Sequence, residues 1–282
     1  GLDAVFMVAY LRQLERSDEM LQAATAKADR LLSLIEQRIS ECNGYAAIAY
    51  SPEELYLNKQ NGVKSVVLGI ENGYAIAKDI NNISRYADLG VSYMTLCHNG
   101  DNDICDSARG KMEHNGLSAF GKEVVMEMNR VGMMVDMSHA SEKSFYDVLE
   151  YSKVPVICSH SSSRTLCDHP RNLTDAQMQA LAEKGGVAQV CMYSGFLKKG
   201  GQATVDDAVK HIMYMIDVMG IDHVGIGSDF DGGGGLPGLE DASWFNMLTR
   251  RLISEGLSSD HLKKIWGENF VTVWSKIRAE KQ

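Results

Sequence analysis

The sequence predicts an α/β fold with a parallel sheet and, within that class, a (β/α)8 TIM barrel. Apolar segments of strand length alternate with segments of helical periodicity along the chain, as in repeated βαβ units. The predicted strands are apolar throughout rather than at alternate positions, which is typical of strands covered on both faces. Five of them end on a residue that can bind a metal ion or transfer a proton, and catalytic groups in such barrels lie at that strand end.

The sheet is expected to contain seven barrel strands. They cover residues 4–10, 65–70, 92–97, 133–138, 155–159, 186–192 and 223–228. A closed barrel of this type needs eight strands. We interpret the short apolar segment 45–49 as an excursion from the barrel, and it is also the alternative candidate for the eighth strand.

The helices are expected between these strands. Apolar residues at helical spacing predict a first helix over about 17–40, and Cys42-Asn43-Gly44 is a typical end for it. Ser51 followed by Pro52 is typical of a helix N-terminus. The later helices are expected at 76–88, 118–130, 141–151, 174–184, 204–219, 240–256 and 259–275.

Composition favours one barrel domain over residues 1–282. Hydrophobic residues make up 45% of the 282 residues, which is enough for a large core. The net charge of −9 and the lack of a basic stripe argue against a nucleic-acid partner. No apolar run approaches the roughly 18–20 residues of a transmembrane helix, so no such segment is expected. The sequence has no GxGxxG turn after the first strand and no GK[ST] sequence, so neither of these motifs indicates a nucleotide-binding site.

The six cysteines leave the cellular compartment open. No CxxC pair occurs, and Cys158 and Cys191 lie in apolar strands, so they are interpreted as buried thiols. Cys97 and Cys105 flank a short loop and are compatible with either a disulfide or two free thiols. The chain starts at Gly1 with no signal peptide before it. We expect a soluble protein, either cytoplasmic or exported.

Glu71, His139 and His160 each end an apolar strand and form the candidate metal ligands. His139 and His160 end consecutive strands, so they should be neighbours on one rim of the barrel. Two neutral imidazoles and a carboxylate are ligands of the zinc type. A single histidine in such a position is as well explained by a hydrogen-bonded rim residue, but three such strand ends together favour a metal. Asp136 and Ser138 are candidates for orienting His139.

Three further residues have positions suited to catalysis or substrate binding. Asp229 ends the last strand beside a glycine-rich loop, where a general acid or base is required; a turn or helix-cap aspartate is the alternative. His98 is placed to donate to a substrate carbonyl and its developing oxyanion. Arg171 is either a clamp for a substrate carboxylate or a surface arginine. Asp101 and Asp103, behind His98, are interpreted as solvated turn residues.

Six motifs in this order resemble those of the membrane (renal) dipeptidase family of zinc peptidases. They are Gly69-Ile70-Glu71-Asn72-Gly73, Leu96-Cys97-His98-Asn99, Val135-Asp136-Met137-Ser138-His139, Ile157-Cys158-Ser159-His160-Ser161-Ser162, Pro170-Arg171-Asn172 and Gly227-Ser228-Asp229-Phe230-Asp231-Gly232. Gly116-Leu117-Ser118-Ala119-Phe120-Gly121 also resembles the start of a family helix. The resemblance extends from about Gly1 to the C-terminus.

The resemblance implies a metal-dependent hydrolase barrel that cleaves dipeptides with two zinc ions. Glu71 would bridge both ions, and His139 and His160 would complete one of the two sites. A metal-activated bridging water would attack the peptide bond. A small dipeptide is the implied partner, and a homodimer is the candidate assembly.

The resemblance also assigns roles to the remaining residues. Asp229 would handle the proton, and His98 would polarise the scissile carbonyl. Arg171 would hold the substrate carboxylate, and Tyr193 would line the pocket.

One departure from the family pattern concerns the other metal site. Family members carry a His-x-Asp segment on the first strand, and no His-x-Asp occurs in this sequence. We therefore expect that the first strand and its two ligands are missing from the given sequence, with a metal-poor variant as the alternative. Two other functions fit the same motifs: an amidohydrolase for another small amide, such as a β-lactam or N-acyl amino acid, and a catalytically impaired barrel lacking one metal site.

Overall fold

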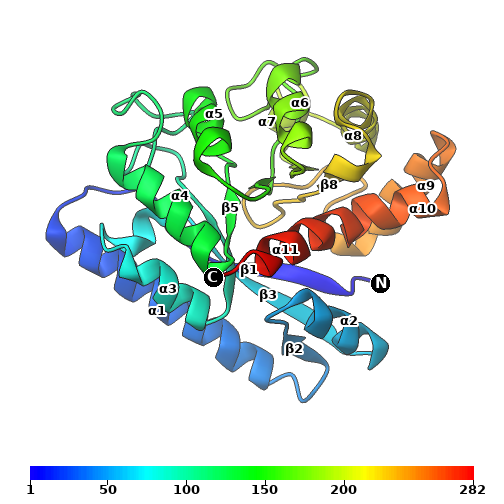
Figure 1. Cartoon of the computed structure of the whole chain (residues 1–282). Coiled ribbons are helices and arrows are strands. Elements are labelled where there is room, and N and C mark those ends of the chain that lie inside the picture. Colours follow the sequence, from blue (N-terminus) through cyan, green and yellow to red (C-terminus); the bar gives the residue numbers. More distant parts are fainter. The chain divides into compact units, whose positions relative to one another are not determined.

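The computed structural model describes residues 1–282 (Figure 1). The chain forms two compact units. Unit 1 comprises Gly1–Val154 and Trp274–Gln282, and unit 2 comprises Pro155–Val273. Each unit contains its own set of parallel strands with helices between them in sequence. The two units are described separately below.

Unit 1 is built on five parallel strands. They are β1 (Ala4–Tyr10), β2 (Ala46–Ile48), β3 (Lys64–Glu71), β4 (Val91–Thr95) and β5 (Met134–Asp136). The neighbours follow the order β1-β3-β4-β5, and β2 pairs with the first part of β3. Ala4 lies opposite Ser65 and Tyr10 opposite Glu71, so the full length of β1 is paired. The segment predicted as an excursion is thus a short strand of this sheet, outside the main strand order.

Four of the helices of unit 1 begin within one or two residues of their predicted starts. The helices of this unit are α1 (Asp18–Ser40), the 3-10 helix η1 (Gly73–Ile76), α2 (Pro52–Gln60), α3 (Asn81–Asp88), α4 (Ala119–Val131) and α5 (Glu142–Tyr151). Ser17, Ser51, Ser118 and Ser141 each accept a hydrogen bond from a backbone N–H of the first turn. Figure 1 shows α3 beside α4, and α1 contacts β1 and η1.

The helix predicted over 76–88 is wrong in its first turn. Ala77 and Lys78 have φ values of 50° and 61°, in the left-handed region that ends a right-handed helix. The chain therefore forms η1, then a turn, and only then α3.

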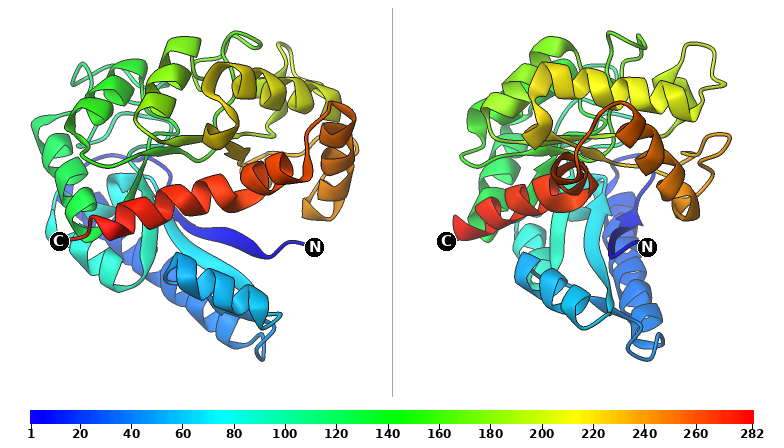
Figure 2. Two further views of the ribbon diagram at one scale, coloured as in Figure 1. Left: turned by 45° about the vertical axis from the view of Figure 1, so that its right-hand side comes forward. Right: turned by 90° about the vertical axis from the view of Figure 1, so that its right-hand side faces the viewer.

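Unit 2 contains three parallel strands in the order β6-β7-β8. They are β6 (Ile157–Cys158), β7 (Val187–Val190) and β8 (Val224–Ile226). Its helices are α6 (Asp175–Glu183), α7 (Ser194–Leu197), α8 (Val205–Met219), η2 (Ile221–His223), η3 (Ala242–Trp244), α9 (Phe245–Ser254), α10 (Ser259–Lys263), the π-turn η4 (Lys264–Glu268) and the start of α11 (Asn269–Ala279). α6 packs against α8, which also contacts α9; Figure 2 shows these helices from two further sides.

The predicted parallel α/β class is confirmed, and every predicted strand is present with bounds that differ by at most a few residues. The predicted helix 259–275 is divided by a π-turn at Gly267, whose backbone is not helical. The single domain, the closed eight-stranded barrel and the missing first strand stay predictions. None of the helices combines the length and the apolar character needed to cross a bilayer.

All six cysteines are free thiols. Cys158 and Cys191 are fully buried, as predicted from their strands. Cys97 and Cys105 are buried as well and are not joined by a disulfide.

Candidate active site

Unit 1 brings Glu71, His98 and His139 together at the carboxyl ends of neighbouring strands. Glu71 is the last residue of β3, while His98 and His139 follow β4 and β5. Nε2 of His139 lies 3.3 Å from Oε1 of Glu71, and Nε2 of His98 lies 3.9 Å from the same oxygen. The two imidazole centres are 4.3 Å apart. The three side chains are at most 16% exposed, so each is held in a largely dry environment.

The orientation of His139 fits a cation between it and Glu71. Nδ1 of His139 lies 3.1 Å from Oδ1 of Asn99, which accepts a hydrogen bond from the neutral tautomer that carries its proton on Nδ1. In the neutral ring Nε2 then presents a lone pair towards the Glu71 carboxylate, which is also an acceptor. Two acceptors at 3.3 Å need a shared proton or metal ion between them. The donor set therefore fits a zinc-type ion.

The backbone around the two histidines is fixed by Ser107. Its Oγ lies 2.5 Å from the carbonyl oxygen of His98 and 3.2 Å from that of His139. The N–H of Ala108 donates to the His139 carbonyl over 2.7 Å. His139 has a φ of 74°, which a residue with a side chain adopts only where its surroundings compensate the strain. These bonds provide that compensation.

The loop that carries His98 is stabilised by buried carboxylates. Asp101 accepts hydrogen bonds from the N–H groups of Ser107 and Lys111, and a Cβ at Gly110 would overlap its Oδ1. Asp106 is fully buried and accepts from the N–H groups of His114 and Gly116. The interpretation of Asp101 as a solvated residue is wrong, because it is only 9% exposed.

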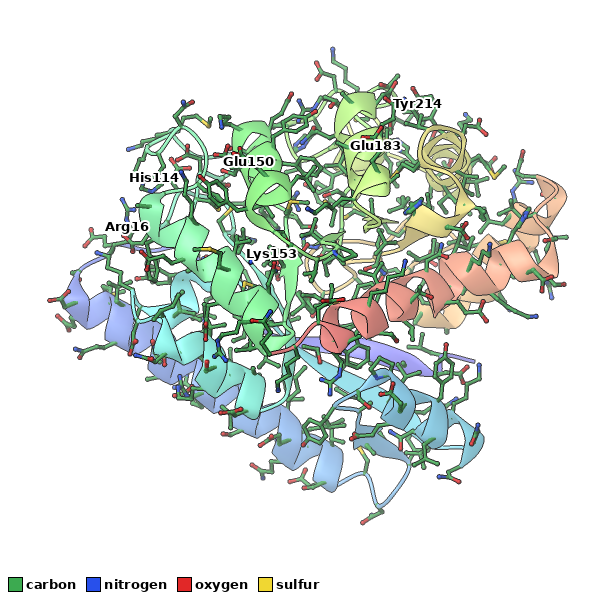
Figure 3. The ribbon with its side chains drawn as sticks, in the orientation of Figure 1. Arg16, His114, Glu150, Lys153, Glu183 and Tyr214 are labelled. Atoms are coloured by element: carbon green, nitrogen blue, oxygen red, sulfur yellow. The ribbon has the colours of Figure 1, made fainter.

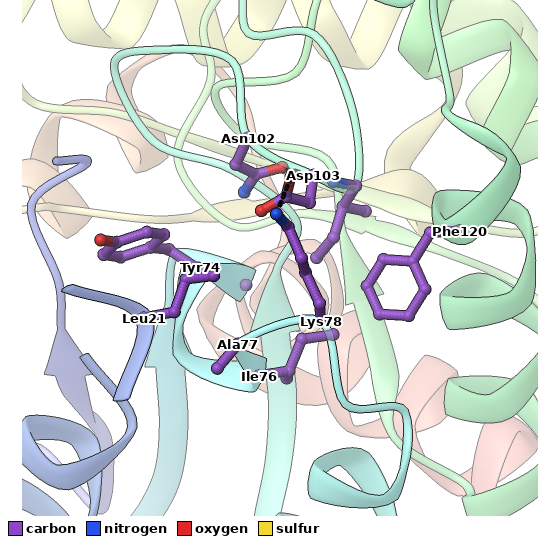
Figure 4. A pocket seen from close by; sticks show the side chains of 10 residues that line it. Leu21, Tyr74, Ile76, Ala77, Lys78, Asn102, Asp103 and Phe120 are labelled. Carbon is purple, nitrogen blue, oxygen red and sulfur yellow. Dashed lines mark hydrogen bonds and ion pairs between the residues drawn. The ribbon is translucent and has the colours of Figure 1, made fainter. Parts of the chain in front are cut away.

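Asp103 forms a more exposed ion-pair cluster beside this loop. It lies 3.5 Å from Arg16 and 3.4 Å from Lys78, and Arg16 also pairs with Glu113. Figure 3 labels Arg16 and His114 on this side of unit 1. A hollow of about 10 Å3 lies between Lys78, Asp103 and Phe120 (Figure 4). That volume suits one water molecule and is far too small for a substrate.

Asp136 supports the strand ends rather than contacting solvent. It is fully buried and accepts hydrogen bonds from Oγ1 of Thr95 and the N–H of Ser138. It thereby links the ends of β4 and β5, from which His98 and His139 follow.

Unit 2 carries His160 and Arg171 in one hydrogen-bonded cluster. Nδ1 of His160 lies 2.8 Å from Oγ of Ser159, and the guanidinium of Arg171 donates to the carbonyl of His160 over 3.3 Å. Arg171 is 4% exposed, so the surface-arginine alternative is wrong. Its guanidinium lies 5.3 Å from the ring centre of Phe196. Tyr193 packs edge-on against the same ring at 4.8 Å and is 41% exposed.

Asp229 follows β8 in a left-handed conformation with a φ of 59°. Burial raises the pKa of Asp229 to about 6, while the charge of Arg171 and the thiol of Cys191 act in the opposite direction. Sγ of Cys191 lies 3.7 Å from Oδ2 of Asp229. A carboxyl group with a pKa near neutrality is suited to accepting and returning a proton. A Cβ at Gly232 would overlap Oδ1 of Asp229, which explains one glycine of this loop.

Four residues that contact these groups were not identified from the sequence. Asn99 directly follows His98 in the motif Leu96-Cys97-His98-Asn99, and this position is the signal that could have identified it. Ser107 and Phe196 act through contacts between distant segments, which residue type alone does not reveal. Cys191 lies in an apolar strand and was interpreted only as a buried thiol.

Comparison with known proteins extends over the whole chain. The sequence model of the membrane dipeptidase family (peptidase family M19) matches residues 1–282. The chain is 42% identical over 225 residues to the uncharacterized dipeptidase C965.12 of Schizosaccharomyces pombe, covering 77% of this chain and 54% of that protein. It is 31% identical over 281 residues to the dipeptidase tcpJ of Claviceps purpurea, covering 97% of this chain and 66% of that protein. The chain thus spans about half the length of the two fission-yeast relatives it matches.

Solved structures share the fold. The probable dipeptidase PvdM from Pseudomonas aeruginosa superposes with a TM-score of 0.95 at 25% identity, over 99% of this chain and 86% of that chain. An amidohydrolase from the same organism gives a TM-score of 0.88 at 28% identity, over 99% and 90%. The family match over the full length and the order of the site motifs agree. The chain therefore belongs to the membrane dipeptidase family, peptidase family M19.

Proposed function

We propose that the protein is a zinc-dependent dipeptidase that hydrolyses the peptide bond of small dipeptides. The observation that carries the proposal is the 3.3 Å approach of Glu71 Oε1 to Nε2 of His139, whose other ring nitrogen faces Asn99. Membership of a metallopeptidase family and relatives named as dipeptidases support it.

Glu71, His139 and His160 are the proposed metal ligands. The donor set of one carboxylate and two imidazoles matches zinc, and the three residues follow parallel strands. Glu71 would bridge to a second ion, as the family resemblance implies. The second ion is also only a proposal, because the family's His-x-Asp ligands for the other metal site do not occur in this sequence.

A bound zinc ion would supply a Lewis acid that lowers the pKa of water. The chain's own residues would do the rest. His98 would donate a hydrogen bond to the substrate carbonyl and stabilise the developing oxyanion. Asp229 would accept a proton from the attacking water and return it to the leaving amine. Arg171 would bind the substrate carboxylate, with Tyr193 beside it.

Turnover measurements on the metal-loaded chain test the proposal. Zinc-loaded protein should hydrolyse L,L- or L,D-dipeptides, lose activity with a chelator, and regain it when zinc is added back. A β-lactam and an N-acyl amino acid in the same panel separate the alternative substrates. Zinc binding without turnover of any of these amides would favour the impaired barrel. A homodimer stays a proposal, which light scattering of the same sample tests.

A further inference from the structure

We propose that Phe196 is a positioning residue that orients Arg171 for the C-terminal carboxylate of the substrate. This deepens the proposed dipeptidase function and rests on it. It predicts that loss of the Phe196 ring weakens binding of a free acid more than binding of its carboxamide.

Three side chains contact the ring of Phe196. The guanidinium of Arg171 lies 5.3 Å from the ring centre, within cation–π range. The ring of Tyr193 packs edge-on at 4.8 Å, and the imidazole of His169 lies at 4.6 Å. Nδ1 of His169 also accepts a hydrogen bond from the N–H of Arg171. Phe196 and His169 together therefore fix both the backbone and the side chain of Arg171.

Phe196 itself is held by buried polar side chains. It lies in α7, a four-residue helix whose length gives it little stability of its own. Nδ2 of Asn172 donates to the carbonyl of Phe196 over 2.8 Å, and Nε2 of His211 lies 3.1 Å from that of Leu197. Asn172 and His211 are each 1% exposed, so these bonds are shielded from water. The ring is thus preorganised before any substrate arrives.

This arrangement suits recognition of a carboxylate. A carboxylate binds two N–H donors of one guanidinium at once, and a ring within cation–π range holds the guanidinium without accepting a conventional hydrogen bond from it. Arg171 is 4% exposed, so its charge acts in an environment that strengthens such a pair.

The test compares a dipeptide with its C-terminal carboxamide on the zinc-loaded full chain. Phe196→Leu removes the ring but keeps an apolar side chain of similar size. The KM for the dipeptide should rise about tenfold with kcat nearly unchanged, since uniform binding energy is lost. The KM for the carboxamide should change by less than twofold. Phe196→Tyr keeps the ring and should restore the preference for the free acid.

Phe270→Leu is the matched control, because Phe270 is a buried phenylalanine of the same unit. It should leave the acid-to-amide preference unchanged. Equal losses on both substrates in Phe196→Leu, or an unchanged preference, would overturn the role of Phe196.

A binding experiment separates this inference from the proposed function. Calorimetry with a phosphinate dipeptide mimic and its carboxamide measures carboxylate selection without turnover. If the wild type binds the free-acid mimic more tightly than the carboxamide and Phe196→Leu does not, the inference is supported even if no dipeptide is cleaved. Absence of binding of either mimic to the zinc-loaded wild type would overturn both proposals.

Discussion

The loop after β4 and the loop after β8 each carry a proposed catalytic residue, but they are held by different means. In the loop of residues 98–118, buried Asp101 and Asp106 collect backbone N–H groups, and Ser107 contacts the carbonyls of both His98 and His139. In the loop of residues 229–241, Asp229 adopts a left-handed backbone, and Gly232 is required next to its carboxylate. The first loop depends on buried carboxylates that accept backbone hydrogen bonds, and the second depends on the missing side chain of Gly232 beside Asp229.

This difference predicts which substitutions affect folding and which affect only chemistry. Removing a buried carboxylate leaves several backbone donors unsatisfied, so the first loop should lose stability. Adding a methyl group to the second loop displaces one carboxylate and leaves the core intact. Three substitutions and one pH comparison, from the largest expected effect to the smallest, test this contrast.

Asp229→Asn should lower kcat about 1000-fold, because a neutral amide cannot accept the proton. The zinc content and the melting temperature should stay at wild-type values or above. Steady-state kinetics and metal analysis measure both. Turnover within a few-fold of wild type would remove Asp229 from the proposed mechanism.

Asp106→Ala should lower the free energy of unfolding by about 3 kcal/mol, since two backbone N–H groups, one buried and one partly buried, lose their acceptor. Urea denaturation measures the change. Asp103→Ala is the control, because the partly exposed ion pairs of Asp103 should be worth less than about 1 kcal/mol. Similar losses in the two variants would show that burial does not distinguish these carboxylates.

Gly232→Ala should lower kcat about tenfold with a change in stability below about 0.5 kcal/mol. The new Cβ would overlap Oδ1 of Asp229 and shift the carboxylate, while the residue itself is exposed. Asp231→Ala, in the same exposed loop, should retain turnover within twofold. A Gly232→Ala enzyme as active as wild type would show that the loop tolerates the methyl group.

The pH dependence of stability gives the smallest effect. The pKa of Asp229 is raised by burial to about 6 in the folded protein, so the folded state holds this proton more tightly than the unfolded state. The resulting stabilisation is present below the ordinary aspartate pKa and is lost as the pH rises through about 6. Metal-free Asp229→Asn should therefore gain on the order of 1–2 kcal/mol relative to wild type between pH 4 and pH 8. If the stabilities of the wild type and Asp229→Asn change in parallel between pH 4 and pH 8, the raised pKa of the buried Asp229 carboxyl group would be contradicted.

The sequence predicted the strands well because apolar runs bounded by turn residues are local signals. Glu71, His98 and His139 were also predictable, since each directly ends such a run. The break at Ala77 and Lys78 was not, because neither residue type favours a left-handed backbone.

The residues that position the site were harder to predict than the site itself. Ser107 lies in a polar loop, and nothing in its residue type indicates contacts with the carbonyls of His98 and His139. Asp101 looked solvated because aspartates in polar loops usually are, yet its backbone partners bury it. Phe196 depends on α7, a helix too short to be identified by periodicity.

A zinc anomalous difference map from crystals of the zinc-loaded protein tests the central claim most directly. The account predicts a peak within bonding distance of Glu71 and Nε2 of His139, with His160 as a further ligand. Crystals of Glu71→Gln should show that peak weakened or lost. A zinc peak that contacts neither Glu71 nor His139, in a protein that still hydrolyses dipeptides, would contradict the account.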